Sequence, residues 1–185
     1  MRLYALCDRD VLRSRNISFA QFIEKVKSFN GEIVQYRNKH DDIATIKNDL
    51  IALRQLWDGF LIINDHYELV PYCDGVHIGQ DDLYAIDSDP SRALKILKLA
   101  IGNDKIIGLS THNSEEIAIA NTLELNYIGL GAYRSTATKK EAGVLGNALD
   151  QFAKESIHPV AAIGGVKTDD LFEYVTYHVI GSGLL

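Results

Sequence analysis

Residues 60–82 read FLIINDHYELVPYCDGVHIGQDD and contain two short apolar runs, Phe60–Ile63 and Gly75–Ile78. Short apolar runs bounded by Gly, Asn and Asp are typical of buried strands. The first run ends in Asn64 and Asp65, and the second ends in a glycine, an amide and two carboxylates. The chain between the runs is too short for a full helix. The pattern therefore predicts two neighbouring strands that both release carboxylates at their C-terminal ends.

The same pattern of short apolar runs recurs along the whole chain. Segments with helical spacing lie between the runs, one opened by Ser18 as a predicted N-cap and another by Pro90 as a first-turn residue. Alternation of strand and helix implies parallel strands with right-handed crossovers, and eight such units predict a closed (β/α)₈ TIM barrel. The predicted strands are Leu3–Cys7, Glu32–Tyr36, Phe60–Ile63, Gly75–Ile78, Lys105–Leu109, Tyr127–Gly131, Val160–Ile163 and Tyr177–Ile180.

The chain has 185 residues, fewer than the roughly 250 that are usual for this barrel. We therefore expect a compact barrel with some reduced crossovers and a shortened C-terminal end. No Pro-, Gly- or Ser-rich linker divides the sequence, so residues 1–185 are interpreted as a single domain. A doubly wound open sheet is the alternative fold.

Composition excludes several classes of protein. The formal net charge is −6 and Lys and Arg form no long run, so the chain lacks the footprint of a nucleic-acid-binding protein. The apolar runs are too short to span a membrane. Cys7 and Cys73 form no Cys-x-x-Cys motif and no secretory leader is recognised, which predicts reduced thiols and a cytoplasmic location. The sequence leaves open whether the chain forms a homo-oligomer.

A barrel brings all eight C-terminal strand ends to one rim, where enzymes of this fold keep their chemistry. There, Asp65 together with Asp82 or Asp81 would supply the oxygen ligands that Mg²⁺ prefers, alongside substrate phosphates. The alternative role of the adjacent carboxylates is N-capping of the next helix, and the two roles are compatible. His77 is interpreted as a strand residue with satisfied hydrogen bonds rather than as a metal ligand.

Cations and an amide follow the second strand. Side-chain alternation places Gln35, Arg37 and Lys39 on one side of it. An amide and two cations suit a heteroaromatic ring that carries a diphosphate, because Arg and Lys both bind phosphate. The competing interpretation is a solvated strand end.

Hydroxyl groups and glycines follow the later strands. Ser110 could donate to a phosphate, and His112 could act as an acid or base, unless His112 is a surface residue. Thr136, Thr138 and Lys139 form a weakly specific pattern for a phosphate-binding loop. Glycine-rich turns at Gly164-Gly165 and Gly181-Ser182-Gly183 follow the seventh and eighth strands, where this barrel usually binds phosphate, although both could simply be tight turns.

Taken in order, these segments resemble the thiamine-phosphate synthase family. The resemblance covers the chain from about Tyr4 to Ser182. It is carried by residues 35–39, 63–65, 74–82, 108–112, 129–131, 136–139 and 163–166. A departure lies in residues 132–135, where Arg134 adds a cation.

The resemblance implies a Mg²⁺-dependent transferase that joins hydroxymethylpyrimidine diphosphate to thiazole phosphate, giving thiamine phosphate and pyrophosphate. It implies Asp65 and Asp82 as the metal ligands, the second of the adjacent aspartates being favoured. The residues that match the pyrimidine diphosphate site are Gln35, Arg37, Lys39, Asn64, Ser110 and Lys139. Those that match the thiazole phosphate site are Thr136, Thr138, Gly165 and Ser182. The catalytic set, which stabilises the departing pyrophosphate, is Arg37, Lys39, Ser110 and Lys139.

Two alternatives to the synthase remain. A thiazole tautomerase of the same superfamily would depend on His112 at the end of the fifth strand. A non-catalytic protein that binds a thiamine precursor would not need both carboxylates. The presence of the full set of charged residues favours the synthase.

Overall fold

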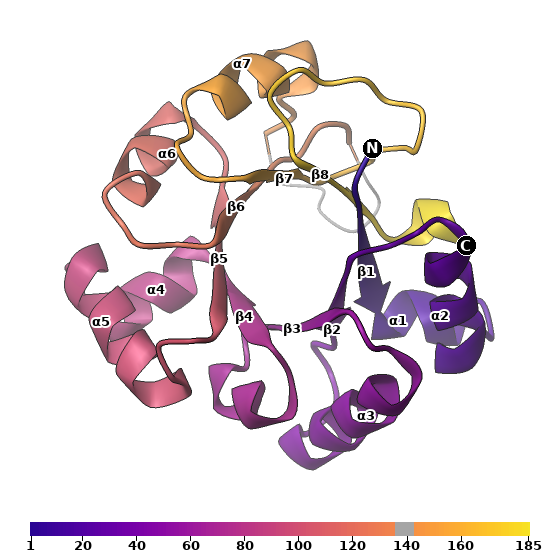
Figure 1. The fold of residues 1–185 in the computed structure, drawn as a ribbon. Coiled ribbons are helices and arrows are strands. Elements are labelled where there is room, and N and C mark those ends of the chain that lie inside the picture. Colours follow the sequence, from indigo (N-terminus) through magenta and orange to yellow (C-terminus); the bar gives the residue numbers. More distant parts are fainter. Residues whose placement is uncertain (136–142) are drawn as a thin grey trace.

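The computed structural model describes residues 1–135 and 143–185, and in it eight parallel strands close into a barrel in chain order (Figure 1). Figure 1 shows the strands as an inner ring with the helices outside it. The predicted barrel is confirmed, and the alternative of an open sheet is wrong. The strands are β1 (Leu3–Asp8), β2 (Ile33–Arg37), β3 (Phe60–Asn64), β4 (Gly75–Ile78), β5 (Ile106–Thr111), β6 (Tyr127–Leu130), β7 (Val160–Ala162) and β8 (Tyr177–Ile180).

The helices are fewer and shorter in parts of the barrel, as the length of the chain predicts. A 3₁₀ helix, η1 (Tyr67–Tyr72), joins β3 to β4, residues 163–176 join β7 to β8 without a helix, and only the short η3 (Ser182–Leu184) follows β8. The other helices are α1 (Arg9–Ser14), α2 (Phe19–Ser28), α3 (Ile43–Leu56), α4 (Gln80–Ile86), α5 (Pro90–Ile101), α6 (Ser114–Ala120), η2 (Gly146–Ala148) and α7 (Leu149–Lys154).

Local sequence determines where the helices begin. The Ser18 hydroxyl accepts a hydrogen bond from the Gln21 amide at 3.2 Å, and the Gln21 side chain accepts one from the Ser18 amide, so the predicted N-cap of α2 is confirmed. Pro90 opens α5 behind the N-cap Asp89. These contacts satisfy amide groups that a helix start otherwise leaves without partners.

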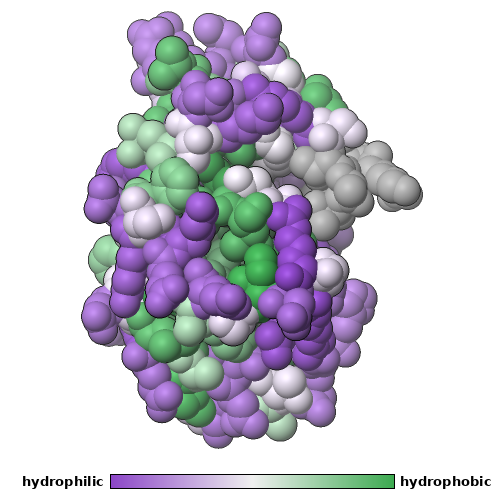
Figure 2. Space-filling model, turned by 90° about the vertical axis from the view of Figure 1, so that its right-hand side faces the viewer, coloured by the Kyte–Doolittle hydropathy of each residue, from purple (hydrophilic) through white to green (hydrophobic). Residues whose placement is uncertain are grey.

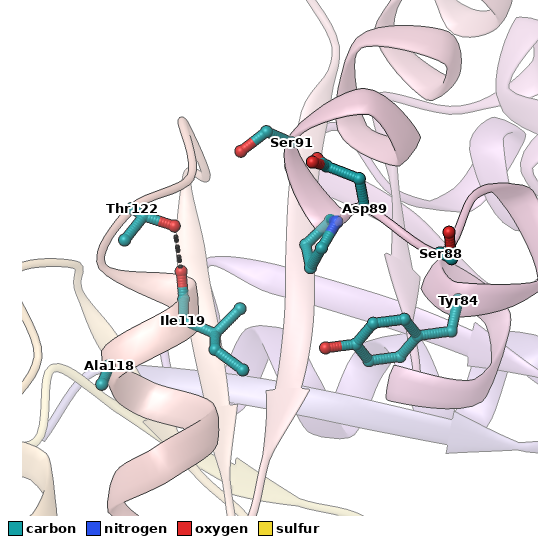
Figure 3. A pocket seen from close by; sticks show the side chains of 8 residues that line it. Tyr84, Ser88, Asp89, Ser91, Ala118, Ile119 and Thr122 are labelled. Carbon is teal, nitrogen blue, oxygen red and sulfur yellow. Dashed lines mark hydrogen bonds between the residues drawn. The ribbon is translucent and has the colours of Figure 1, made fainter.

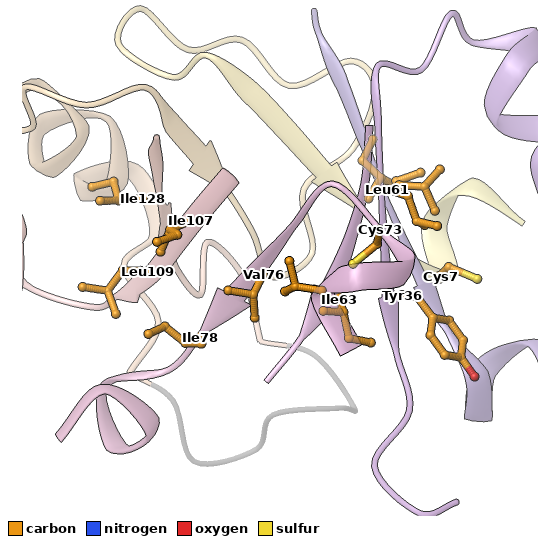
Figure 4. Packing of buried hydrophobic residues seen from close by; sticks show 14 of the residues in the cluster. Cys7, Tyr36, Leu61, Ile63, Cys73, Val76, Ile78, Ile107, Leu109 and Ile128 are labelled. Carbon is orange, nitrogen blue, oxygen red and sulfur yellow. The ribbon is translucent and has the colours of Figure 1, made fainter. Parts of the chain in front are cut away.

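Side-chain alternation divides the core into two layers. One set of strand residues packs outward against the helices, and Figure 4 shows Ile63, Val76 and Leu109 in this layer. The other set fills the barrel lumen with Tyr4, Ile33, Ile62, Tyr127, Ala161 and Val179. Position parity along a strand therefore decides whether a residue stabilises the helix layer or faces the lumen.

Two lumen positions must be glycine because aromatic rings occupy the space beside them. A Cβ atom on Gly108 would lie 2.1 Å from the ring of Tyr127, and one on Gly129 would lie 2.9 Å from Cε1 of His77. Both distances are below van der Waals contact. The lumen is thus filled by large rings facing positions without side chains, a form of interior packing that leaves little void.

Asp74, which directly precedes the second of the two apolar runs, has a structural role. It precedes β4, at the end of the barrel opposite the rim that carries Asp65 and Asp82. Its Oδ2 atom accepts hydrogen bonds from the Leu61 amide at 2.7 Å and from Arg54 Nη1 at 2.8 Å. Asp74 therefore joins the end of α3 to the starts of β3 and β4.

The right-hand side of the barrel in Figure 1 carries α1, α2, η3 and both termini. Figure 2 shows this side, and a strip of hydrophobic residues reaches the surface there between hydrophilic bands. Within residues 1–135 and 143–185, no helix has both the length and the apolar character needed to cross a membrane.

The β4–β5 contact provides a test of the strand packing. A Cβ atom on Gly75 would lie 2.1 Å from the backbone oxygen of Ile106, and a backbone atom in a closed barrel has little room to move. Gly75→Ala should therefore lower the free energy of unfolding by about 3 kcal/mol in urea denaturation. Gly143→Ala is the matched control, because among the described residues no atom beyond its chain neighbours lies within 4 Å of its added Cβ, and it should change stability by less than about 0.5 kcal/mol. Equal effects of the two substitutions would contradict this account of the β4–β5 contact.

Candidate active site

The C-terminal ends of β1 to β5 bring the predicted polar residues to one rim of the barrel. Asp8 of β1 is in register with Arg37 of β2, and Asn64 of β3 is in register with His77 of β4. Strand parity directs Arg37 and Asn64, like Gln35, toward the lumen rather than toward the helices. The side chains that the sequence analysis grouped by strand end therefore meet over the lumen.

Asp65 carries the clearest electrostatic signature of this rim. Burial raises the pKa of the Asp65 carboxyl, and the negative charge of Asp82 raises it further. The cations Lys39 and Arg37 act in the opposite direction on the same pKa. Asp82 after β4 and the two cations at the end of β2 are thus close enough to act on the Asp65 carboxyl after β3, so groups from three strand ends converge here.

The backbone at Asp65 is in the left-handed region, with φ of 66°. Asp and Asn tolerate this conformation better than other residues with a side chain, which explains a short polar residue directly after β3. The Asp65 amide donates to the His77 carbonyl at 2.9 Å, which fastens the turn to β4. Strained backbone at a strand end is common where side chains are held for function.

Asp82 accepts a hydrogen bond at the start of α4 that Asp81 does not accept. Its Oδ2 atom accepts a hydrogen bond from the Gly79 amide at 2.9 Å, in the first turn of α4. The predicted capping role therefore belongs to Asp82, which is also the carboxylate that raises the pKa of Asp65. Capping and proximity to Asp65 coexist in this residue.

Asp8 is a site residue that the sequence analysis missed. Its Oδ2 atom accepts a hydrogen bond from Arg37 Nη1, and its Oδ1 atom accepts from the amides of Asp10 and Val11 at 3.1 and 3.2 Å. Asp8 is only 5% exposed, so this charge-assisted contact orients the guanidinium firmly. The signal was present in the sequence, because β1 ends in the carboxylate Asp8 just as Asp65 directly follows β3.

Gln35 and Ser110 are both held by hydrogen bonds inside the lumen. Gln35 is 5% exposed and its Nε2 atom donates to Tyr4 Oη at 2.6 Å. The Ser110 hydroxyl lies 2.9 Å from Nε2 of His77, and the Ser110 carbonyl accepts from Gln80 Nε2 at 2.6 Å. The interpretation of His77 as a strand residue with satisfied hydrogen bonds is confirmed.

His112 and Arg134 both have polar partners within the protein. His112 Nδ1 lies 2.9 Å from Oε2 of Glu116 in α6. Arg134 forms two hydrogen bonds of 2.6 Å with the carboxylate of Asp170 and a third of 2.7 Å with the Gly165 carbonyl. Arg134 thus ties the turn after β6 to the turn after β7.

The glycine-rich turns after β7 and β8 differ in character. Gly164 and Gly165 have φ of 89° and 68°, so this turn requires glycine. Ser182 is exposed at the start of η3, and its carbonyl accepts from Arg15 Nη1 at 2.8 Å. The remaining predicted residues, Thr136, Thr138 and Lys139, lie outside the described residues.

The donor set fits Mg²⁺. Residues 1–135 and 143–185 contain no cluster of three or more His, Cys, Asp and Glu side chains that would hold a metal by protein ligands alone. Asp65 and Asp82 offer two carboxylates that repel one another. Mg²⁺ is typically held by one or two carboxylates, with waters and substrate phosphates as the other ligands.

A surface cavity lies apart from this rim. It has a volume of about 470 Å³ and lies outside the barrel, among residues of α4, α5 and α6 (Figure 3). Figure 3 shows Tyr84 pointing across it toward Ile119. The charged residue in its lining, Asp89, accepts a hydrogen bond from the Arg92 amide at 2.9 Å as the N-cap of α5. The cavity therefore lacks the charged groups that are gathered at the rim.

Comparison with known proteins gives a family match over most of the chain. A family model described as thiamine monophosphate synthase matches residues 3–182. The chain belongs to the thiamine monophosphate synthase family. It is 32% identical over 177 residues to a thiamine-phosphate synthase of Persephonella marina, covering 92% of this chain and 79% of that protein. It is 35% identical over 182 residues to a thiamine-phosphate synthase of Lawsonia intracellularis, covering 95% of this chain and 79% of that protein.

A solved structure has the same fold as this chain. The thiamine phosphate pyrophosphorylase of Pyrococcus furiosus superposes with a TM-score of 0.79 and 22% identity, covering 98% of this chain and 87% of that one. At this identity the likeness concerns the fold, and membership of the thiamine monophosphate synthase family follows from the sequence matches.

Burial of the Asp65 carboxylate and its repulsion by Asp82 predict a gain in stability when the charge of Asp65 is removed. A raised carboxyl pKa means that the folded state binds the proton more tightly than the unfolded state, so stability falls as the pH rises through this window. Asp65→Asn should therefore raise the urea midpoint at pH 7, and Asn accepts the left-handed backbone. The gain should disappear as the pH falls below about 3.9, the ordinary pKa of Asp.

Asp81→Asn is the control, because it removes a neighbouring exposed carboxylate that does not raise the pKa of Asp65. A lower urea midpoint for Asp65→Asn than for the unsubstituted protein at pH 7 would contradict the electrostatic account.

Proposed function

We propose that this chain is a thiamine-phosphate synthase that joins hydroxymethylpyrimidine diphosphate to thiazole phosphate, with thiamine phosphate and pyrophosphate as products. The observation that carries the proposal is that Asp82, Lys39 and Arg37 all lie close enough to act on the buried Asp65 carboxyl at one rim of the closed barrel. This combination of paired carboxylates and cations suits a diphosphate with a bound divalent cation. Membership of the thiamine monophosphate synthase family supports the same substrate class.

The pyrimidine diphosphate would be held from two directions. The amides of Gln35 and Asn64 and the hydroxyl of Ser110 would contact the ring side. Arg37, Lys39 and Lys139 would contact the diphosphate, with Arg37 oriented in advance by Asp8. Groups that are held before the substrate arrives lose less entropy when it binds. Thr136, Thr138, Gly165 and Ser182 are the proposed contacts of the thiazole phosphate.

Asp65 and Asp82 would hold Mg²⁺ as the cofactor. When bound, the ion would offset negative charge on the diphosphate oxygens and relieve the repulsion between the two carboxylates. The protein side chains would then act around it: Arg37 and Lys39 bind phosphate oxygens, and Asp82 keeps its contact with the Gly79 amide.

The proposed reaction is a substitution at the methylene carbon of the pyrimidine. The bond between this carbon and the diphosphate oxygen breaks, and its electron pair leaves with pyrophosphate. The lone pair of the thiazole ring nitrogen then forms the new carbon–nitrogen bond. No proton is transferred, so the site needs no general base. Its task is to stabilise charge on the leaving group, for which Arg37, Lys39 and Lys139 are suited and to which Ser110 contributes a hydroxyl.

Two further proposals concern the cell and the assembly. We place the protein in the cytoplasm, which Cys7 and Cys73 support as two buried free thiols. The partners that we propose are the two phosphorylated substrates and, in a homo-oligomer, a second copy of the chain. Light scattering of the purified protein measures that stoichiometry.

The direct test is formation of thiamine phosphate. The purified chain, incubated with pyrimidine diphosphate, thiazole phosphate and Mg²⁺, should release thiamine phosphate and pyrophosphate in equal amounts. The product should be lost when a chelator removes the metal. Folded protein that yields no product under these conditions would refute the proposal. If the chain instead isomerised a thiazole and lost that activity in His112→Ala, the tautomerase assignment would replace it.

The two adjacent aspartates give a finer prediction. Asp82→Asn should lower kcat/KM at least about 100-fold, because an amide is a poor Mg²⁺ ligand, while the amide oxygen still accepts from the Gly79 amide. Asp81→Asn should change kcat/KM less than about threefold. Steady-state kinetics at varied Mg²⁺ concentration measures both. Equal losses, or the larger loss in Asp81→Asn, would show that the metal ligand is wrongly assigned.

A further inference from the structure

A row of side-chain hydrogen bonds crosses the lumen from β2 to β5. Gln35 Nε2 donates to Tyr4 Oη at 2.6 Å, and Tyr4 Oη lies 2.7 Å from Tyr127 Oη. Tyr127 Oη lies 3.0 Å from His77 Nδ1, and His77 Nε2 lies 2.9 Å from Ser110 Oγ. These five residues, hereafter the lumen chain, belong to five strands. The two end residues are on strands separated by β3 and β4.

Packing fixes the middle of the lumen chain. Tyr4 and Tyr127 are 1% and 3% exposed and meet edge to face, with ring centroids 5.7 Å apart. The Tyr127 ring stacks on His77 at 5.5 Å with an interplanar angle of 23°. Gly108 and Gly129 leave the space that these rings fill. The two phenols and the imidazole therefore have little freedom to reorient.

The proton order in the lumen chain has one consistent direction. Because Gln35 donates to Tyr4, the Tyr4 proton needs an acceptor, and the described contact that offers one is Tyr127 Oη. Burial raises the pKa of both phenols, so both keep their protons. Tyr127 then donates to His77 Nδ1, which leaves the His77 Nε2–H to donate to Ser110 Oγ. The opposite order would bury the Tyr4 proton without an acceptor, which is costly.

This order determines what the two end residues offer to a ligand. Ser110 Oγ accepts from His77, so its own proton remains to be donated elsewhere. Gln35 uses one N–H on Tyr4, so its carbonyl oxygen remains as an acceptor. Reversing the direction of the hydrogen bonds in the lumen chain would exchange these roles. The donor at Ser110 and the acceptor at Gln35 are therefore set together.

We propose that Tyr127 is a positioning residue that, through Tyr4 on one side and His77 on the other, orients Gln35 and Ser110 jointly for one ligand. The ligand class is a heteroaromatic ring with adjacent donor and acceptor atoms. The inference rests on the pyrimidine diphosphate site proposed above and names a residue that acts on that site without contacting the substrate. Its phenol lies in the lumen below the rim and reaches the site through its neighbours.

The first experiment measures the lumen chain without any substrate. Long-range ¹H–¹⁵N spectra of the full chain report the tautomer of each histidine, and His77→Gln assigns the signal. His77 should be protonated at Nε2. In Tyr127→Phe, which keeps the ring but removes the hydroxyl, a His77 population protonated at Nδ1 should appear. Tyr177→Phe is the matched control, because Tyr177 packs against Tyr4 in the same lumen but is not a member of the lumen chain. An unchanged His77 signal in Tyr127→Phe would overturn the proposal.

The second experiment measures the effect on catalysis. Tyr127→Phe should raise KM for the pyrimidine diphosphate about tenfold, with kcat and KM for the thiazole phosphate changed less than about threefold. When Tyr127 is present, the effects of Gln35→Ala and Ser110→Ala on KM for the pyrimidine diphosphate should depart from additivity by about threefold or more. They should combine additively in the Tyr127→Phe protein. Additivity in both backgrounds would overturn the proposal.

The two experiments separate this inference from the proposed function. A protein without synthase activity whose His77 tautomer depends on Tyr127 would refute the proposed function and retain the lumen chain. An active synthase whose His77 tautomer and pyrimidine KM are unchanged by Tyr127→Phe would refute the positioning role alone. Thermal unfolding of Tyr127→Phe and Tyr177→Phe checks that both variants are folded under the assay conditions.

Discussion

Closure of the parallel sheet is the constraint on which the rest of this structure depends. Because β8 pairs with β1, no strand edge is left, and every strand residue faces either the helices or the lumen. The same closure directs all eight C-terminal ends to one rim. Arg37, Asn64 and Ser110 therefore approach one another although long stretches of sequence separate them. A carboxylate at the other end of a strand, such as Asp74, becomes part of the scaffold instead.

Much of this arrangement could be predicted from the sequence, because strand position and parity follow from local patterns. The eight apolar runs agree with the observed strands to within one or two residues, and their number implies the barrel. The residues at strand ends then follow from topology alone. The preference for Asp82 over Asp81 as the proposed metal ligand came from the family resemblance, since both precede Leu83 in the same short helix and spacing does not distinguish them.

Features that depend on contacts across the barrel could not be predicted in this way. Asp8 holds Arg37 because β1 and β2 are in register, and no local pattern reveals that register. Tyr4 and Tyr127 appear in the sequence as ordinary β-forming aromatics. Their hydroxyl groups meet only because the barrel brings β1 and β6 within reach across the lumen. The sequence shows Arg134 only as an additional cation after β6, and the fold gives it Asp170 as a partner.

The lumen glycines have a consequence for how this barrel can change over time. Tyr127 fills the space that a side chain at position 108 would need, and His77 fills the space that a side chain at position 129 would need. A larger residue at either position can be accommodated only if the facing ring becomes smaller at the same time. Relatives in which Tyr127 is replaced by a small residue should therefore be the ones in which position 108 carries a side chain. Each ring and its glycine would be inherited as a pair, so a change of lumen chemistry has to pass through two coordinated substitutions.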